Sequence, residues 1–284
     1  MAAEQLTGSA DLSEEEQEAV ELLLFRLADD EFVIAERYTE WQVRSPTLES
    51  DLAVANIAQD ELGHARLWYD LLEDFDYKEQ DLIWERPADQ WRHSTLTELP
   101  RPEGGWEDVI VRGYLYDAAE DLRLDALVDS SYGRIRDRVG KVRGEEGYHL
   151  EHAQNWLERL TEDEAGRERV QSAVDRQFPH ALTLFEPADE ELEARIDDLG
   201  LRTMPLTEQG EAWLERVVPF LESLGVETPM TGRDEVTADM LPEVVGRDGT
   251  HTDDWFDLYE DFTHTYNQID VGDPVRIMKD PNDE

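Results

Sequence analysis

Apolar residues recur along this chain with the three-to-four-residue spacing of amphipathic helices. The first run follows a capping box of Ser13 and Glu16 and predicts a helix over 14–43, which the SerPro pair at 45–46 ends. Later runs predict helices over about 48–75, 107–130, 134–160, 163–185 with a bend at Pro179, and 208–224. Strand patterns are scarce, so we expect an all-α fold.

The predicted helices are arranged along the chain as two hairpins. A less regular crossover of about 30 residues, rich in Pro and Trp, separates the pair 14–43 and 48–75 from the pair 107–130 and 134–160. This order predicts a ferritin-like four-helix bundle with additional C-terminal helices. We expect the helical domain to cover 1–230 and an acidic C-terminal extension, rich in turn residues, to cover 231–284.

The charge of the chain is extreme and changes the expected environment. The 284 residues contain 70 Asp and Glu against 26 Lys and Arg, a formal net charge of −44. Repulsion on this scale destabilises a compact state at low salt and is largely screened near molar salt. The composition therefore predicts a protein of a halophilic cytosol, with most acids on solvated faces.

Composition also excludes several classes of function. Clustered Lys and Arg for phosphate binding are lacking, which argues against nucleic acid as a partner. Without cysteine the chain has no disulfide and no thiolate metal ligand, so any metal must be held by carboxylates and imidazoles. No signal peptide and no apolar run approaching the roughly 20 residues of a membrane span is found. We expect a soluble, cytoplasmic protein.

Two ExxH motifs carry the candidate chemistry: Glu61 with His64, and Glu146 with His149. Residues three apart on a helix face the same way and can hold one metal ion. In a chain this rich in Glu, such a motif also arises by chance, so the count alone is weak evidence. Context strengthens it, because Asp60 and Glu145 directly precede the two Glu and are suited to orient an imidazole.

An internal repeat adds one acid to each hairpin. Glu31 precedes Glu61 by about the same interval as Asp117 precedes Glu146. A carboxylate from each of two helices plus ExxH from each of the other two is the ligand set of a dinuclear iron or manganese site in a four-helix bundle. Because acids are so frequent here, the alternative that Glu31 or Asp117 is a surface residue stays open.

The other acids and histidines near these motifs rank lower as ligands. Glu120 and Asp121 rival Asp117 but occupy other parts of the helix surface. His152 is expected to be solvated or to orient a ligand rather than to bind metal. The remaining histidines show no ligand spacing and are expected to be ordinary polar residues: His93, His180, His251 and His264.

Three stretches resemble the PaaA/PaaC family of phenylacetyl-CoA epoxidase subunits, and more closely the PaaC type. They are LADDEFVIAERYTEWQVRSPTLESDLAVANIAQDELGHARLWYDLL, GYLYDAAEDLRLDAL and EEGYHLEHAQNWLERL, within a match over roughly 20–225. The resemblance implies a ferritin-like fold and, in the catalytic PaaA type, a di-iron centre that activates O₂. The family's ligand positions fall here on Glu31, Glu61, His64, Asp117, Glu146 and His149. All are of a metal-binding type, whereas many PaaC chains have lost ligands.

The resemblance further implies a multisubunit enzyme that adds one oxygen atom of O₂ to the ring of phenylacetyl-CoA. Its partners would be PaaA-type and PaaB-type chains and a reductase that supplies electrons from NADPH. This chain cannot be that reductase, since it has neither cysteine nor a Gly-rich dinucleotide fingerprint. Two readings remain beside a catalytic di-iron subunit: a non-catalytic PaaC-type scaffold, and a ferritin- or rubrerythrin-like protein. The absence of cysteine argues against rubrerythrin.

Overall fold

The chain is all-α in a computed structural model that describes residues 6, 8–101, 105–230, 232 and 236–268, which confirms the predicted class. The α-helices of this part are α1 (Glu14–Thr39), α2 (Leu48–Leu72), α3 (Thr95–Glu98), α4 (Trp106–Leu127), α5 (Gly133–Leu160), α6 (Glu164–Leu182), α7 (Glu190–Asp198), α8 (Leu206–Ser223) and α9 (Asp253–Gln268).

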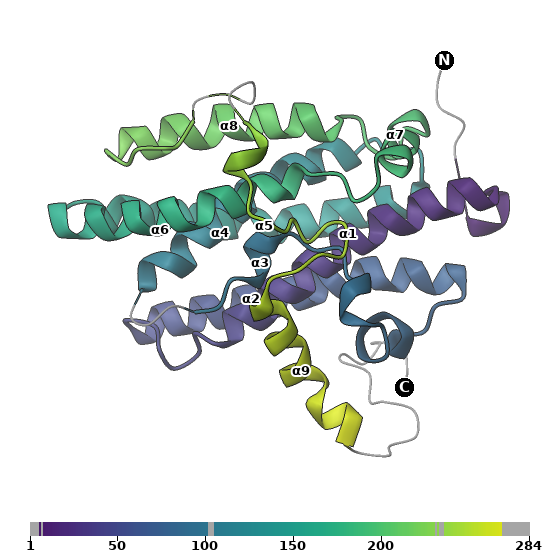
Figure 1. Cartoon of the computed structure of the whole chain (residues 1–284), viewed down its shortest axis with the longest axis horizontal. Helices are drawn as coiled ribbons and strands as arrows, with labels where there is room; N and C mark the ends of the chain where they lie inside the picture. The colour runs from purple at the N-terminus through teal and green to yellow at the C-terminus, as the bar shows by residue number, and fades with distance from the viewer. Residues whose placement is uncertain (1–5, 7, 102–104, 231, 233–235, 269–284) are drawn as a thin grey trace.

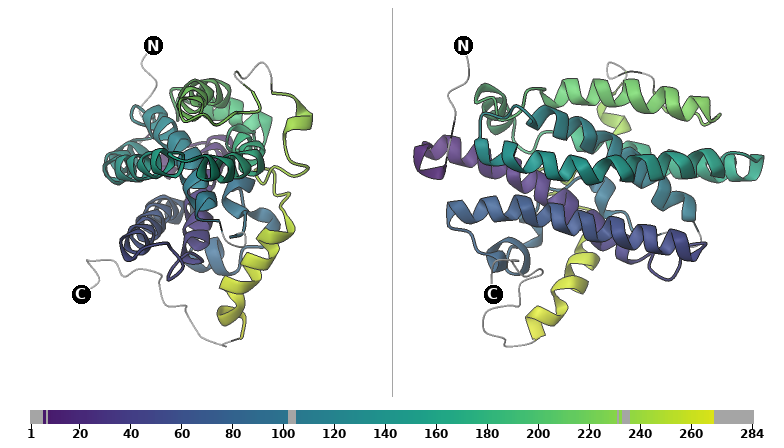
Figure 2. Two further views of the ribbon diagram at one scale, coloured as in Figure 1. Left: turned by 90° about the vertical axis from the view of Figure 1, so that its left-hand side faces the viewer. Right: turned by 180° about the vertical axis from the view of Figure 1, so that it is seen from behind.

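Two long hairpins form the centre of the molecule, consistent with a ferritin-like bundle. Helix α1 packs along α2, α4 packs along α5, and α2 contacts α5 between the hairpins. Helices α6 and α8 pack against α4 on one side, and α9 extends from the other side (Figures 1 and 2). The short α7 contacts α1. Helices α6, α7 and α8 thus cover part of the four-helix core formed by α1, α2, α4 and α5.

The predicted boundaries hold to within four residues in the described part. Helices α2 and α6 each end three residues earlier than predicted and continue as a short 3₁₀ segment. Helix α1 ends at Thr39 rather than at 43, because Val43 adopts a left-handed φ of 60° and its N–H donates to Asp51 Oδ1 at 2.6 Å. Helix α4 ends at Leu127 rather than at 130. Here the N–H of Ser131 leaves the helical pattern and donates to the carbonyl of Gly200 at 2.8 Å.

Helices α3, α7 and α9 were not predicted. The largest is α9, which lies within 231–284, and its Trp255 side chain is fully buried against the bundle. Arg247, just before α9, is also fully buried. At Gly246 (φ 78°) a Cβ atom would lie 2.2 Å from the carbonyl oxygen of His93, so only glycine permits this close approach. Residues 236–268 therefore pack as part of the folded body; the division at residue 230 stays a prediction, and 269–284 lie outside the described residues.

Two apolar clusters fill the interior and leave a polar level between them. On α2, Ile57 belongs to one cluster and Trp68 to the other, with Glu61 and His64 between them. On α5 the order is reversed: Val142 precedes Glu146 in the second cluster, and Ala153 and Leu157 follow in the first. The apolar clusters thus hold the helices on both sides of the polar groups.

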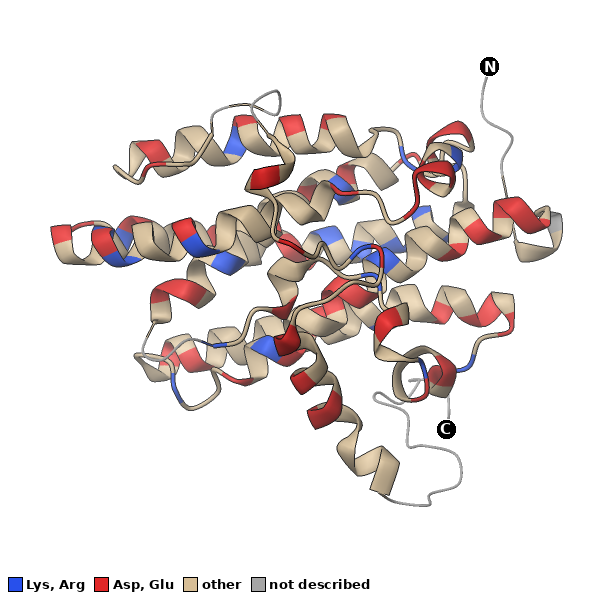
Figure 3. Cartoon of the chain, viewed as in Figure 1, with Lys and Arg blue, Asp and Glu red and all other residues tan. Residues whose placement is uncertain are grey.

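Acidic residues occur along all the long helices (Figure 3). Of the described helices, none has both the length and the apolar character that crossing a bilayer requires. Because so many acids lie along these helices, the stability of the fold should depend on the salt concentration.

We expect the stability of the chain to rise steeply with salt. Raising KCl from about 0.1 M to about 1 M shortens the Debye length from about 10 Å to about 3 Å and so screens the repulsion among acids. The thermal midpoint should increase by several degrees at least, since about 1 kcal/mol shifts it by about 2–4 °C for a protein of this size. Circular dichroism melts measure this shift. Chloride is preferred to sulfate, which stabilises proteins regardless of charge, and an unchanged midpoint would contradict the prediction.

Candidate metal centre

Three consecutive acids in the middle of α1 are fully buried and point to different neighbours. Successive residues of a helix are about 100° apart, so Asp29, Asp30 and Glu31 cannot share one site. Asp29 accepts hydrogen bonds from the Tyr69 hydroxyl at 2.6 Å and the Arg92 N–H at 2.8 Å. Only Glu31 is directed at the motifs of the other helices.

All six predicted ligands come together in the interior between α1, α2, α4 and α5. Each is at most 3% exposed: Glu31, Glu61, His64, Asp117, Glu146 and His149. They form two groups, and within each group the ligand atoms lie within 4.8 Å of one another. One group is Glu31, Glu61, His64 and Glu146, and the other is Glu61, Asp117, Glu146 and His149. Glu61 and Glu146 belong to both groups, so each of these carboxylates could contribute to holding two metal ions.

Both imidazoles direct Nδ1 toward these carboxylates. Nδ1 of His64 lies 3.1 Å from Glu146 Oε1, and Nδ1 of His149 lies 3.3 Å from the same oxygen and 3.5 Å from Glu61 Oε1. Each imidazole therefore contacts the ExxH glutamate of the opposite hairpin.

The acids that precede the two motifs hold the far side of each ring. Nε2 of His64 lies 2.7 Å from Glu145 Oε2, and Nε2 of His149 lies 3.4 Å from Asp60 Oδ2. Each acid thus serves the histidine of the other motif, across the two hairpins. When Nε2–H donates to a carboxylate, the lone pair of Nδ1 is left for a metal ion.

Most polar atoms facing the centre lack a hydrogen-bond partner. They are Oε1 and Oε2 of Glu31, Glu61 and Glu146, Oδ1 of Asp117, and Nδ1 of His64 and His149. A buried polar group without a partner costs roughly 1–3 kcal/mol, and more when it is charged. Four carboxylates and two imidazoles therefore fit a pair of metal ions, and two divalent cations would balance the four negative charges.

The protonation pattern reflects the same crowding of acids. Burial and the neighbouring carboxylates raise the pKa of Glu31 and of Asp117 well above the usual range. For His149, burial disfavours the charged ring, but Glu146 and Glu61 outweigh it and raise the pKa to about 12. Without a metal these groups would share protons, and cation binding would displace them.

Glu120 was ranked below Asp117 as a ligand and belongs to neither group, although it is buried beside them. It forms an ion pair with Arg123, which also donates to Asp30 Oδ2 at 2.6 Å. Burial, opposed by Arg123 and reinforced by Glu146, raises the pKa of Glu120 to about 7. The expectation that Glu120 occupies another part of the helix surface than Asp117 was wrong, because residues three apart on a helix lie on nearly the same face. Asp121 instead pairs with Arg216 at 2.6 Å.

Three further histidines, on α5, α6 and α9, do not belong to the two ligand groups. His152 lines a surface hollow with Tyr148 and Trp156. His180 Nδ1 contacts the Thr95 hydroxyl at 2.9 Å. His264 is exposed on α9.

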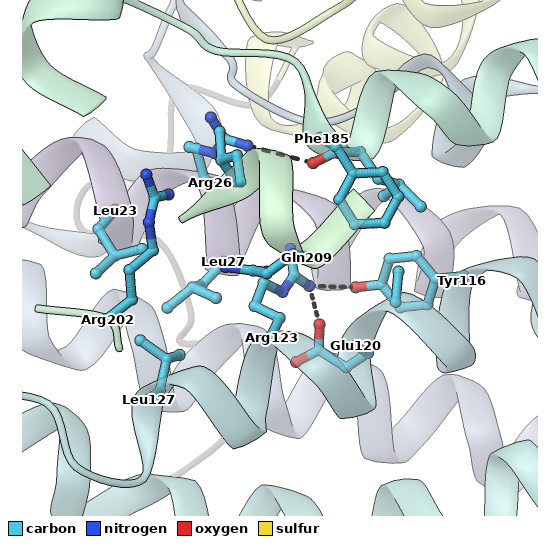
Figure 4. Close-up of a pocket in the computed structure, with 13 residues that line it drawn as sticks. Leu23, Arg26, Leu27, Tyr116, Glu120, Arg123, Leu127, Phe185, Arg202 and Gln209 are labelled. Atoms are coloured by element: carbon cyan, nitrogen blue, oxygen red, sulfur yellow. Dashed lines mark hydrogen bonds and ion pairs between the residues drawn. The ribbon is translucent and has the colours of Figure 1, made fainter. Parts of the chain in front are cut away.

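A small cavity borders Glu120 and Arg123 on the side facing α8 (Figure 4). Leu23, Leu27 and Phe185 contribute apolar walls, and Arg123 is bonded to both Tyr116 and Glu120 within it (Figure 4). Its volume of about 20 Å³ is close to what one water molecule occupies. An aromatic ring does not fit there without movement of the surrounding side chains.

Sequence comparison relates the chain to known proteins. The sequence profile of the family described as "Phenylacetic acid catabolic protein" (PaaA_PaaC) matches residues 3–271. The C subunit of the 1,2-phenylacetyl-CoA epoxidase of Escherichia coli (strain K12) is 27% identical over 231 residues, covering 80% of this chain and 88% of that protein. The A subunit of the same enzyme is 27% identical over 192 residues, covering 66% of this chain and 62% of that protein.

Proposed function

Because the chain belongs to the phenylacetic acid catabolic protein family, we propose that it is a subunit of a phenylacetyl-CoA ring 1,2-epoxidase and holds a di-iron carboxylate centre. The observation that carries this proposal is the pair of buried ligand groups that share Glu61 and Glu146. Both relatives named above are subunits of one epoxidase, which supports the reaction class.

The donor set suits iron. Carboxylate and imidazole ligands from four helices are those of dinuclear iron and manganese proteins. Glu31 with His64 would hold one ion, Asp117 with His149 the other, and Glu61 with Glu146 would bridge them. Two bound iron ions would supply the redox chemistry that activates O₂.

The remaining residues around the centre orient ligands, hold protons and exclude water. Glu145 and Asp60 orient the two imidazoles. Glu120, with a pKa of about 7, can hold or release a proton beside Glu146 near neutral pH. The apolar clusters on both sides keep the centre away from bulk water.

The proposal includes partners outside this chain. Electrons would come from NADPH through a separate reductase component, and PaaA-type and PaaB-type chains would complete the enzyme. The charge of −44 supports a halophilic cytoplasm as the place of action.

The alternative is a structural PaaC-type subunit that supports a PaaA-type catalytic chain. The cavity beside Glu120 is too small for the ring of phenylacetyl-CoA. If the substrate ring enters by this cavity, side chains must move or a partner subunit must open it.

Iron analysis tests the proposed centre directly. Full-length chain loaded with Fe²⁺ without oxygen, at high salt, should retain about two iron ions and give the spectrum of a carboxylate-bridged pair. His64→Ala and His149→Ala should each lose most of this iron, because each removes a buried ligand and its oriented imidazole. His264→Ala, at an exposed position, is the matched control. Trace iron in the wild type would refute the di-iron centre.

A further inference from the structure

A second cluster of potential metal ligands lies outside the proposed di-iron centre. His93, Glu98 and His251 are all buried, and their ligand atoms lie within 4.8 Å of one another. His93 and Glu98 belong to the crossover between the hairpins, and His251 precedes α9. None of the three is a member of the ligand groups described above.

One oxygen of Glu98 is positioned by Thr252 and the other faces both imidazoles. The Thr252 N–H and hydroxyl donate to Oε2 at 2.9 and 2.6 Å. Oε1 lies 2.7 Å from His251 Nδ1 and 3.2 Å from His93 Nε2. Bonds of about 2.0–2.2 Å at tetrahedral angles place ligand atoms about 3.3 Å apart, so the shorter contact must open for an ion to enter. The two stacked imidazoles must also turn, so that both lone pairs point at the same ion.

Both ring nitrogens of His251 face oxygen atoms. Nδ1 faces Glu98 Oε1, and Nε2 lies 3.3 Å from the carbonyl oxygen of Trp91. A neutral imidazole has one N–H, so it can donate to only one of these acceptors. If Nε2–H donates to the carbonyl, Nδ1 has a lone pair directed at a carboxylate, and a cation between them resolves the conflict.

The ring of His93 also has unused hydrogen-bonding capacity. It is fully buried; Nδ1 has no hydrogen-bond partner, and Nε2 lies 3.2 Å from Glu98 Oε1 without the geometry of a hydrogen bond. Its ring stacks on His251 at 4.5 Å and contacts Trp255 edge-on at 4.3 Å, measured between centroids. A neutral His93 ring offers one nitrogen lone pair for a bond to a metal ion.

We propose that His93, Glu98 and His251 bind one Zn²⁺ ion that fastens the segment before α9 to the crossover of the bundle. Two imidazoles and one carboxylate are ligands that zinc prefers, and a water molecule can complete a tetrahedral set. The three side chains are buried too deeply for a substrate to approach, so the role is structural. The rival explanation is a metal-free ion pair between a protonated His251 and Glu98. The experiments below distinguish the zinc site from this ion pair.

Metal stoichiometry provides the first test. Full-length chain is stripped with a chelator at high salt, reloaded with ZnCl₂, gel-filtered in metal-free buffer and analysed for zinc. His251→Asn and His93→Asn should each hold one zinc ion fewer than the wild type, and His264→Asn should hold the same number. The difference of one ion does not depend on how far the di-iron centre fills, so failure of one proposal is distinguishable from failure of the other. Equal zinc in wild type and both variants would overturn the site.

Cobalt spectroscopy provides a second test, which remains informative if His251→Asn and His93→Asn fold poorly. The chain carrying His64→Ala and His149→Ala, which lacks two ligands of the other centre, should take up about one Co²⁺ and show the visible bands of a four-coordinate ion. Zn²⁺ should displace the Co²⁺ and bleach these bands. Zn²⁺ should also raise the thermal midpoint of the wild type but not of His93→Asn. A colourless chain with an unshifted midpoint would favour the metal-free ion pair.

Discussion

Replacing Glu61 with alanine is expected to abolish epoxidation by a complex reconstituted with the partner subunits. Glu61 belongs to both ligand groups, so its loss removes a donor from each iron position at once. Its side chain is fully buried, so the outer surface is unchanged and assembly with the partners should persist. Turnover of phenylacetyl-CoA and co-elution in gel filtration at high salt measure the two effects. Glu49→Ala, at an exposed position of α2, is the control.

The same substitution separates a catalytic subunit from a scaffold. In the metal-free chain, Glu61→Ala should lower stability, because burial alone would raise the pKa of the Glu61 carboxyl, but His149 and His64 favour the charged carboxylate and hold its pKa below the ordinary value. In the iron-loaded chain the loss should be larger, because iron binding also contributes to the folded state. If Glu61→Ala is more stable under both conditions and turnover stays at the wild-type rate, the centre is vestigial and the partner chain carries the chemistry.

Asp30→Asn is expected to cost about 3–5 kcal/mol of the free energy of unfolding. Oδ2 of Asp30 accepts hydrogen bonds from Arg123 at 2.6 Å and from Arg247 at 2.7 Å, and Oδ1 accepts one from the Ser94 N–H at 2.8 Å. The amide leaves the fully buried Arg247 guanidinium with only carbonyl oxygens as hydrogen-bond acceptors. Urea unfolding at high salt measures the loss. Asp125→Asn breaks the half-exposed pair with Arg143 and should cost less than about 1 kcal/mol.

The pH dependence of Asp30 gives this prediction a second readout. Burial alone would raise the pKa of Asp30, but Arg247 and Arg123 outweigh it and hold the pKa below the ordinary value. The carboxylate therefore stabilises the fold above its unfolded pKa of about 3.9, and this contribution is lost as the pH falls through the folded pKa. Asp30→Asn should reduce the loss of stability on acidification. An unchanged acid profile would show that Asp30 contributes little.

Local patterns were sufficient for the residues of the main site and for the longer helices other than α9, but not for α3 and α7. The ExxH spacing and the repeated acid in each hairpin identified all six residues that the fold brings together, because helix periodicity alone sets which side chains share a face. The signal for α9 was present too, since Trp255, Leu258 and Phe262 follow helical spacing. It was obscured by the surrounding acids and turn residues.

Contacts between distant segments could not be read in this way. Asp30 follows Asp29 and precedes Glu31 with the same chemistry, and nothing local indicates that Arg247 neutralises it from 217 residues away. Likewise, Glu98 and His251 are 153 residues apart and show no ligand spacing. Such pairs depend on how the crossover and the segment before α9 pack together.

The sequence by itself determined the all-α class, the two hairpins and the faces on which Glu61, His64, Glu146 and His149 lie, because these follow from periodicity within one helix. Only the tertiary structure decided that Glu145 serves His64 while Asp60 serves His149, and that His93 meets His251. The physical reason is that burial, partner choice and the pKa of an acid depend on side chains brought from other helices, and their positions are fixed only when the whole bundle packs.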